Sequence, residues 1–438
     1  MSLLVPLGSL PSMEALMPPR DQLLEAMDRI YRFRMTTTSG GNLSIRDGAD
    51  VWITPARVDK GNLRREDIVL VKQDGSTSGL HRPSSELPFH HAIYNARSDI
   101  QAIVHAHPVA LVAFSMCGVL PPTRLFHQAH QVCGEVAIAE YALPGSRELG
   151  ERIAATARRG VDCILLENHG VVVGGSTLLE AYQRFEALEF AARTGIQARR
   201  LGTVQLLDER QLALAKSRRI DLTPLPPRPA STHECELRRQ LCEFVRRGVR
   251  QRLLISTEGS FSARVDAESF LITPSQKDRH GLTPADIVMV RADTCEAGKM
   301  PSRAALAHQA IYRKHPEVKS ICFAHPIHAT AFSITDESID SRTIPESYIV
   351  LRQVEKLEYG LPYRDVDALA DSVSMKQPTA LLANDGCLVV GTSPLDTFDR
   401  LEVLESTAEA LIQCRSIGPL HAMGNEVIDE LDIAFGMK

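Results

Sequence analysis

The chain has 438 residues, a formal net charge of −5 and a pI near 6.3, with 44% hydrophobic and 24% charged residues. This length allows two or three domains, each with its own core. The ordinary composition and weak acidity argue against a nucleic-acid-binding protein and against a membrane-surface protein. Nine cysteines without a CxxC pair indicate reduced thiols. We therefore expect a cytoplasmic protein that binds neither nucleic acid nor membrane.

The predicted elements alternate between helix and strand along the chain. Residues 1–18 lack a basic start, contain prolines and are expected to form a flexible N-terminus. Residues 42–55 predict a hairpin that turns near Asp47–Gly48. The other predicted elements in this half are helices at 20–33, 84–97 and 177–193, strands at 66–71 and 102–108, and a strand–turn–strand unit at 162–175. This mixture predicts a sheet with helices packed on it.

The second half of the chain repeats the first. Residues 83–115 align with residues 301–333 without a gap, and 13 of the 33 positions are identical. The period is nearly half of the chain, which is too long for a solenoid unit, so it indicates a duplicated domain. We predict a first copy at 19–205, a linker at 206–232 and a second copy at 233–438. The proline-rich part of this linker is expected to be semi-extended.

Three histidines in the first copy suggest a metal site. His105 and His107 lie two residues apart in a predicted strand, so their side chains project from the same face. His169 is the natural third ligand, because its neighbour Gly170 allows close approach of the backbone. Glu86, at the start of the preceding helix, could be a fourth ligand or the general base. The alternative is that this domain is simply rich in histidine.

The second copy helps to decide between these interpretations. His107 aligns with His325, but His105 aligns with Phe323, His169 with Asp385 and Glu86 with Ala304. Three of four proposed groups are lost together while their surroundings persist, as expected for a metal site that is lost as a unit. We therefore predict metal binding in the first copy and none in the second.

The motifs GGNLS, ITP, PSSE, HAHP and NHG, in this order and spacing, resemble the class II aldolase/adducin family. The resemblance implies two copies of a three-layer α/β/α domain with a largely antiparallel central sheet. It also implies one divalent metal per chain, most often Zn²⁺ but also Mn²⁺ or Co²⁺, on His105, His107 and His169, with Glu86 as catalytic acid/base. The anion-binding groups of the family correspond to Asn42, Ser84 and Ser85.

Two features leave alternatives open. Many sugar-phosphate members of the family have a hydroxyl residue and a glycine after ITP, where this chain has Ala56 and Arg57. Arg57 could bind a phosphate or carboxylate through its guanidinium group, or it could be a solvated surface charge. His127 and His130 could reach the pocket or be ordinary polar loop residues.

The resemblance predicts a metal-dependent lyase of the aldolase type. Such an enzyme would cleave a C–C bond in a hydroxy-ketone or hydroxy-keto-acid, phosphorylated or not, through a metal-stabilised enediolate. The alternatives are a decarboxylase or dehydratase that uses the same site, or an adducin-like interaction protein without catalysis. The expected partners are a small sugar or hydroxy-acid and further copies of the chain, since two duplicated chains could form a pseudo-fourfold ring.

Overall fold

The computed structural model describes residues 17–217, 220–226 and 228–437, so nearly all of the predicted flexible N-terminus lies outside the described residues. The contacts divide the chain into two compact units that do not follow the repeat boundary. Of the described residues, the N-terminal unit comprises those up to Pro121 and Cys133–Phe185, and the C-terminal unit comprises Pro122–Val132 and those from Glu186 onward. A segment of the first copy is thus packed into the unit that carries the second.

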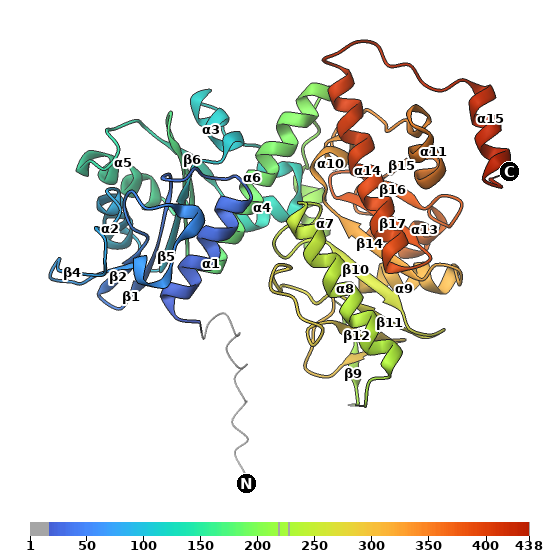
Figure 1. Ribbon diagram of the computed structural model, residues 1–438, viewed down its shortest axis with the longest axis horizontal. Helices are drawn as coiled ribbons and strands as arrows, with labels where there is room; N and C mark the ends of the chain where they lie inside the picture. The colour runs from blue at the N-terminus through green and yellow to red at the C-terminus, as the bar shows by residue number, and fades with distance from the viewer. Residues whose placement is uncertain (1–16, 218–219, 227, 438) are drawn as a thin grey trace, which may run out of the picture. The chain divides into compact units, whose positions relative to one another are not determined.

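The N-terminal unit is built on an eight-stranded sheet with the order β4-β3-β2-β1-β5-β8-β7-β6 (Figure 1). Only β6 and β7 run parallel, so the sheet is largely antiparallel as predicted. The predicted hairpin is confirmed, because β1 and β2 pair up to Asp47 and Asp50 and Gly48 has a φ of +62°. The strands are β1 (Asn42–Asp47), β2 (Asp50–Ile53), β3 (Val69–Val71), β4 (Thr77–Ser78), β5 (Ala102–Ala106), β6 (Val136–Ala139), β7 (Cys163–Leu166) and β8 (Gly170–Gly175).

Helices cover both faces of this sheet. Helices α2 and α5 pack on one face, where Phe89 and Ile153 join sheet residues such as Ile103 in a buried core. Helices α1 and α3 contact the strands on the other face. The helices that begin in the first copy are α1 (Pro19–Arg32), α2 (Leu87–Ala96), α3 (Val109–Met116), α4 (His127–Cys133), α5 (Arg147–Ala157), α6 (Leu178–Leu201) and α7 (Glu209–Ser217).

The C-terminal unit contains a nine-stranded sheet with the order β15-β16-β17-β14-β10-β11-β12-β13-β9. Strand β9 comes from the predicted linker and pairs in parallel with β13, and α7 also lies in that linker, so this segment is more ordered than we predicted. The strands are β9 (Thr223–Leu225), β10 (Ser260–Arg264), β11 (Ser269–Ile272), β12 (Val288–Arg291), β13 (Thr294–Glu296), β14 (Ser320–Ala324), β15 (Glu355–Leu357), β16 (Thr379–Leu382) and β17 (Gly386–Gly391).

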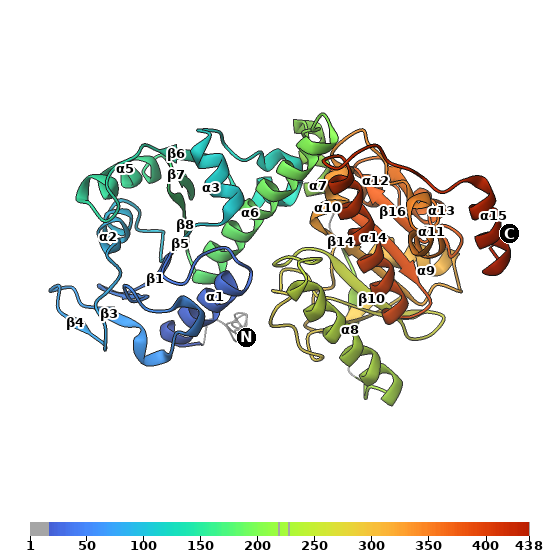
Figure 2. The same cartoon turned by 45° about the horizontal axis from the view of Figure 1, so that its top comes forward.

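This second sheet is also covered on both faces. Helices α8 and α14 pack against each other and against the same face, as Figure 2 shows, while α9 and α13 contribute to the core on the other face. The helices are α8 (Thr232–Arg250), α9 (Ala305–Lys314), α10 (Ile327–Ser333), α11 (Pro345–Leu351), α12 (Leu361–Arg364), α13 (Val366–Asp371), α14 (Pro394–Cys414) and α15 (Asn425–Ala434). Short 3-10 turns lie at Lys60–Asn62, Arg65–Asp67, Thr123–Leu125 and Ser341–Thr343.

The duplication predicted from the sequence is visible in the elements. Strands β5 and β14 have the same length and begin at aligned positions of the two copies, and so do helices α2 and α9. Each copy therefore has the predicted three-layer α/β/α architecture. Within the described part of the chain, no helix combines the length and the apolar character needed to cross a bilayer.

Candidate metal centre

Three histidines of the N-terminal unit converge at one end of the central sheet. His105 lies in β5, His107 follows the end of that strand, and His169 lies in the turn between β7 and β8. One ring nitrogen from each lies within 4.8 Å of the others, and the Nε2 atoms of His105 and His107 are 3.1 Å apart. Two nitrogens bound to one zinc ion are at most about 4.2 Å apart. The rings therefore need only a small movement to bind one ion, and this donor set fits the expected metal.

Glycines allow the backbone to approach these rings. A Cβ atom at Gly170 would lie 2.6 Å from Cδ2 of His107 and 2.7 Å from the carbonyl oxygen of Ala106. A Cβ atom at Gly40 would lie 2.9 Å from Nδ1 of His107. The role of Gly170 follows the prediction, whereas the sequence interpretation did not single out Gly40. Its signal was available, because the aligned residue of the second copy is Glu258.

The orientation of His105 is fixed by the backbone of a neighbouring strand. Its side chain is fully buried, and its Nδ1 atom donates a hydrogen bond of 2.9 Å to the carbonyl oxygen of Val171. This bond leaves Nε2 as the nitrogen that faces His107 and Glu86. A metal-ligating histidine commonly has its second nitrogen held in this way, because the bond sets the tautomer and the ring orientation.

Glu86 lies directly before α2 and faces two of the three histidines. Its Oε2 atom accepts a hydrogen bond of 2.8 Å from Nδ2 of Asn42 and lies 3.1 Å from Nε2 of His105. Its Oε1 atom lies 3.6 Å from Nε2 of His169 and is buried without a hydrogen-bond partner. One carboxylate oxygen is thus held by the protein, while the other is available to a bound molecule.

The electrostatics of the cluster favour a carboxylate at Glu86 and neutral imidazoles at His107 and His169. Burial raises the pKa of Glu86, but the positive charge and hydrogen bond of His105, together with His169 and Asn42, bring its pKa well below the usual value. Burial lowers the pKa of His107 to about 3, and the charges of His105 and His169 act in the same direction. Burial and His105 also lower the pKa of His169. Neutral imidazole is the form that binds a metal.

The predicted anion-binding residues have different surroundings. Asn42 is buried and hydrogen bonds to both Glu86 and His90, so it positions Glu86. The hydroxyl of Ser84 is also buried and accepts a hydrogen bond from the backbone nitrogen of Glu86. Ser85 is exposed. Arg57 is exposed as well, with a φ of +56°, and among the described residues it forms no side-chain hydrogen bond.

His127 belongs to the C-terminal unit, together with the rest of residues 122–132. There its side chain is buried, and its Nδ1 atom lies 3.8 Å from Oδ1 of Asp385. Neither ring nitrogen of His127 has a hydrogen-bond partner.

The second copy has replaced the site with a different buried cluster. Phe323 packs against His308 with ring centroids 5.0 Å apart. Asp385, which aligns with His169, accepts hydrogen bonds from the hydroxyl of Tyr363 at 2.7 Å and from Nε2 of Gln128 at 3.0 Å. Within residues 17–217, 220–226 and 228–437, the N-terminal triad is the one group of three or more His, Cys, Asp or Glu side chains that could hold a metal ion.

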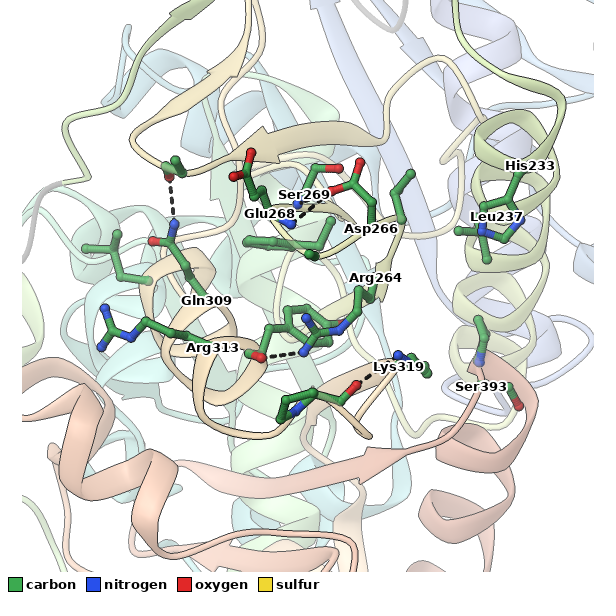
Figure 3. Close-up of a pocket in the computed structure, with 18 of the residues that line it drawn as sticks. His233, Leu237, Arg264, Asp266, Glu268, Ser269, Gln309, Arg313, Lys319 and Ser393 are labelled. Carbon is green, nitrogen blue, oxygen red and sulfur yellow. Dashed lines mark hydrogen bonds between the residues drawn. The ribbon is translucent and has the colours of Figure 1, made fainter.

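The C-terminal unit also contains a groove that is not lined by Phe323, His308 or Asp385. It has a volume of about 1260 Å³ and contains Arg264, Lys319 and His233 among its lining residues (Figure 3). Two of its cations already have partners in the protein, because Arg264 donates to the carbonyl oxygen of Val318 and Lys319 to that of Pro316. The groove therefore gives no reason to place the chemistry there.

Comparison with known proteins gives a consistent result for both copies. A family model described as the class II aldolase and adducin N-terminal domain matches residues 21–196 and 239–412. L-fuculose phosphate aldolase of Methanococcus maripaludis is 36% identical over 165 residues, which are 37% of this chain and 88% of that protein.

Two further relatives carry different names. A 5-methylthioribulose-1-phosphate/5-deoxyribulose-1-phosphate aldolase of Rhodospirillum rubrum is 32% identical over 216 residues, covering 48% of this chain and 96% of the relative. A 3-oxo-tetronate 4-phosphate decarboxylase of Haemophilus influenzae is 34% identical over 178 residues, covering 39% and 84%. Each of these relatives is thus nearly spanned by less than half of the present chain.

Proposed function

The chain belongs to the class II aldolase and adducin family, so it is a lyase of the class II aldolase type, and we propose that it cleaves a C–C bond in a hydroxy-ketone or hydroxy-keto-acid with one bound divalent metal. The substrate is a small sugar or hydroxy-acid, phosphorylated or not, and the enzyme acts in the cytoplasm. Zn²⁺ is the preferred ion, with Mn²⁺ or Co²⁺ as alternatives. The observation that carries the proposal is the convergence of His105, His107 and His169 beside Glu86.

The residues divide the work in a simple way. The three imidazoles would hold the ion, which, when bound, supplies a positive charge that stabilises the enediolate left by C–C cleavage. Glu86 takes and returns the proton at Oε1, the oxygen without a hydrogen-bond partner. Asn42 holds Oε2 and prevents the carboxylate from rotating away. Arg57, Ser84 and Ser85 are proposed to bind the anionic group of the substrate.

A decarboxylase is the second candidate, and one relative of this chain is named as such. The same triad and the same Glu86 suit both reactions, because each leaves negative charge on a carbon next to a carbonyl group. An adducin-like binding role is disfavoured for the first copy by its complete histidine triad. For the second copy we propose a structural role without a catalytic metal.

The test is a screen of the purified protein with added Zn²⁺ or Mn²⁺ against hydroxy-ketones, hydroxy-keto-acids and their phosphates. Release of an aldehyde is expected, and it disappears on chelation. Release of CO₂ in place of an aldehyde would support the decarboxylase. A protein that binds the metal and turns over none of these compounds would contradict the lyase.

We also propose that the protein forms a homo-oligomer in which two duplicated chains make a pseudo-fourfold ring. The support so far is the duplication itself, since the two copies present related surfaces.

A further inference from the structure

Five buried polar side chains form a continuous row of hydrogen bonds between β1 and α2, and Glu86 is one end of it. Asn42 and Ser44 are two residues apart on β1, so they project from the same face of the sheet. Glu86, His90 and Tyr94 follow each other at intervals of four residues, so they lie on one side of α2 and of the residue before it. We call this set the polar row. Its order is Glu86, Asn42, His90, Ser44, Tyr94, and all five residues are buried.

The hydrogen atoms of the polar row can be placed from its Glu86 end. A carboxylate only accepts hydrogen bonds, so Asn42 must direct its Nδ2 atom to Oε2 of Glu86, at 2.8 Å. The Oδ1 atom of Asn42 then faces His90 and also only accepts, so His90 carries its hydrogen on Nε2. Burial lowers the pKa of His90 to about 3, so the ring is neutral. Its Nδ1 atom therefore accepts a hydrogen bond of 2.7 Å from the hydroxyl of Ser44.

The Tyr94 end of the polar row requires the same direction. Among the described residues, the hydroxyl of Tyr94 has Ser44 as its one hydrogen-bond partner, at 2.7 Å. A buried hydroxyl hydrogen without an acceptor is costly, so Tyr94 donates to Ser44. Ser44 then donates its own hydrogen to His90. In the opposite direction Tyr94 would lose its acceptor, and Asn42 would turn its oxygen toward the Glu86 carboxylate.

The second copy contains the same row without the end that faces the metal centre. Ser262, His308 and Tyr312 align with the last three members and make the same contacts, at 2.6 and 2.7 Å. Ser260 stands in place of the asparagine and contacts Nε2 of His308 at 2.7 Å, and Ala304 stands in place of the glutamate. The contacts that join strand to helix are thus common to both copies. The extension to a carboxylate is specific to the first copy.

We propose that His90 is a positioning residue for Glu86, and that its Nε2–H holds the Asn42 amide in the orientation that offers Nδ2 to Oε2 of Glu86. The inference rests on the proposed role of Glu86 in proton transfer. Because the amide cannot turn, Oε2 stays occupied and the proton is taken up at Oε1, the oxygen without a partner. His90 acts through Asn42, and the direction of the row is set by Tyr94 and Ser44.

The tautomer of His90 tests the direction of the polar row without any turnover. Long-range ¹H–¹⁵N spectra of the full chain at pH 7, with Zn²⁺ bound or removed, should show His90 as neutral imidazole with its hydrogen on Nε2. The signals are assigned by their loss in His90→Gln. An Nδ1–H tautomer, or a charged ring, would reverse or break the row and overturn the proposal.

Two matched substitutions separate positioning from packing. His90→Leu and His308→Leu remove the same ring from equivalent contacts, so both should lower stability toward urea to a similar extent. With the substrate found by the aldehyde-release screen, kcat should fall about 10-fold or more in His90→Leu with KM little changed. In His308→Leu it should stay at the wild-type value. His90→Gln keeps an N–H donor toward Asn42 and should recover part of the loss. Equal kcat values of the two Leu variants would overturn the proposal.

Asn42→Ser provides a test that does not depend on the folding of His90→Leu. It gives the first copy the residue that the second copy has at this position, so the contacts between strand and helix remain while Glu86 loses its partner. If His90 acts through Asn42, His90→Gln lowers kcat in the wild-type background and has no further effect in Asn42→Ser. Additive losses would contradict this route. If the screen yields no turnover, the proposed function fails, and the His90 tautomer still decides the direction of the polar row.

Discussion

At the scale of single residues, the central feature is that the two carboxylate oxygens of Glu86 have different surroundings. Asn42 and His105 engage Oε2, while Oε1 is buried without a hydrogen-bond partner. A buried carboxylate oxygen without a partner is costly unless a ligand or proton uses it. The arrangement therefore favours a role in proton transfer over a purely structural ion pair.

Glu86→Gln tests this role. Gln keeps the size and the hydrogen-bonding capacity of the side chain but cannot take a proton, so we expect the turnover rate to fall by about 10²- to 10⁴-fold. Metal content, measured by elemental analysis, should remain close to the wild-type value. Glu151→Gln, at a side chain 62% exposed, is the control and should leave the rate unchanged. Equal activity of Glu86→Gln and wild type would contradict the assignment.

At the scale of elements, the turn between β7 and β8 sets the position of His169 relative to His107. Gly170 lies where any side chain would contact His107 and the carbonyl oxygen of Ala106. Gly170→Ala is expected to displace β8 or the His107 ring and to weaken Zn²⁺ binding by about 10-fold or more, an effect like that of losing a residue that orients a ligand. Chelator competition measures this change.

Gly202→Ala is the matched control for this substitution. A Cβ atom at Gly202 meets no atom within 4 Å, so metal affinity should not change. Should Gly170→Ala bind Zn²⁺ as tightly as wild type, the close approach would not be required for the site.

A second element-scale feature is a buried histidine that joins a strand to a helix in the second copy. His308 of α9 hydrogen bonds to Ser260 and Ser262 of β10 at 2.7 and 2.6 Å, and burial lowers its pKa from 6.5 to about 3. Because the folded pKa is depressed, the unfolded state binds more protons between about pH 6.5 and 3. The free energy of unfolding should therefore fall as the pH drops through this window, by about 1.4 kcal/mol per pH unit.

Urea unfolding between pH 7 and 4.5 checks this expectation. His308→Gln should lower stability at pH 7, since the serine contacts are disturbed, but should show a shallower loss on acidification. His233→Gln, at an exposed histidine, should retain the wild-type slope. Identical slopes for all three proteins would mean that His308 does not remain neutral in the folded state.

Much of the fold and part of the site could be predicted from local pattern. Strand periodicity placed His105 and His107 on one face, and Gly170 marked the turn before β8. The features that could not be predicted depend on contacts between residues far apart in the sequence. The pairing of Asn42 with His105 across β1 and β5, and hence the Asn42–Glu86 bond, depends on strand register. The proline-rich sequence around α7 and β9 predicts a linker. That these residues form a helix and a strand depends on their packing against other elements.

At the scale of the whole molecule, one repeat carries the complete triad and the other an altered cluster around Asp385. The unit division shows that residues 122–132 and 186–217 of the first copy serve the fold of the second. From the sequence we predicted two separate copies joined by a linker. The packing of first-copy segments in the C-terminal unit could not be predicted, because contacts between distant segments leave no local sequence pattern. The duplicated chain thus has the same architecture in both copies and the histidine triad in the first copy.

The metal content of the purified protein tests the central claim most directly. Elemental analysis after dialysis with Zn²⁺ should give about one ion per wild-type chain. His105→Ala should lose that ion. His325→Ala should retain it, although His325 is the second-copy residue that aligns with His107. A wild-type protein without a stoichiometric transition metal, or one whose ion survives in His105→Ala, would contradict the account.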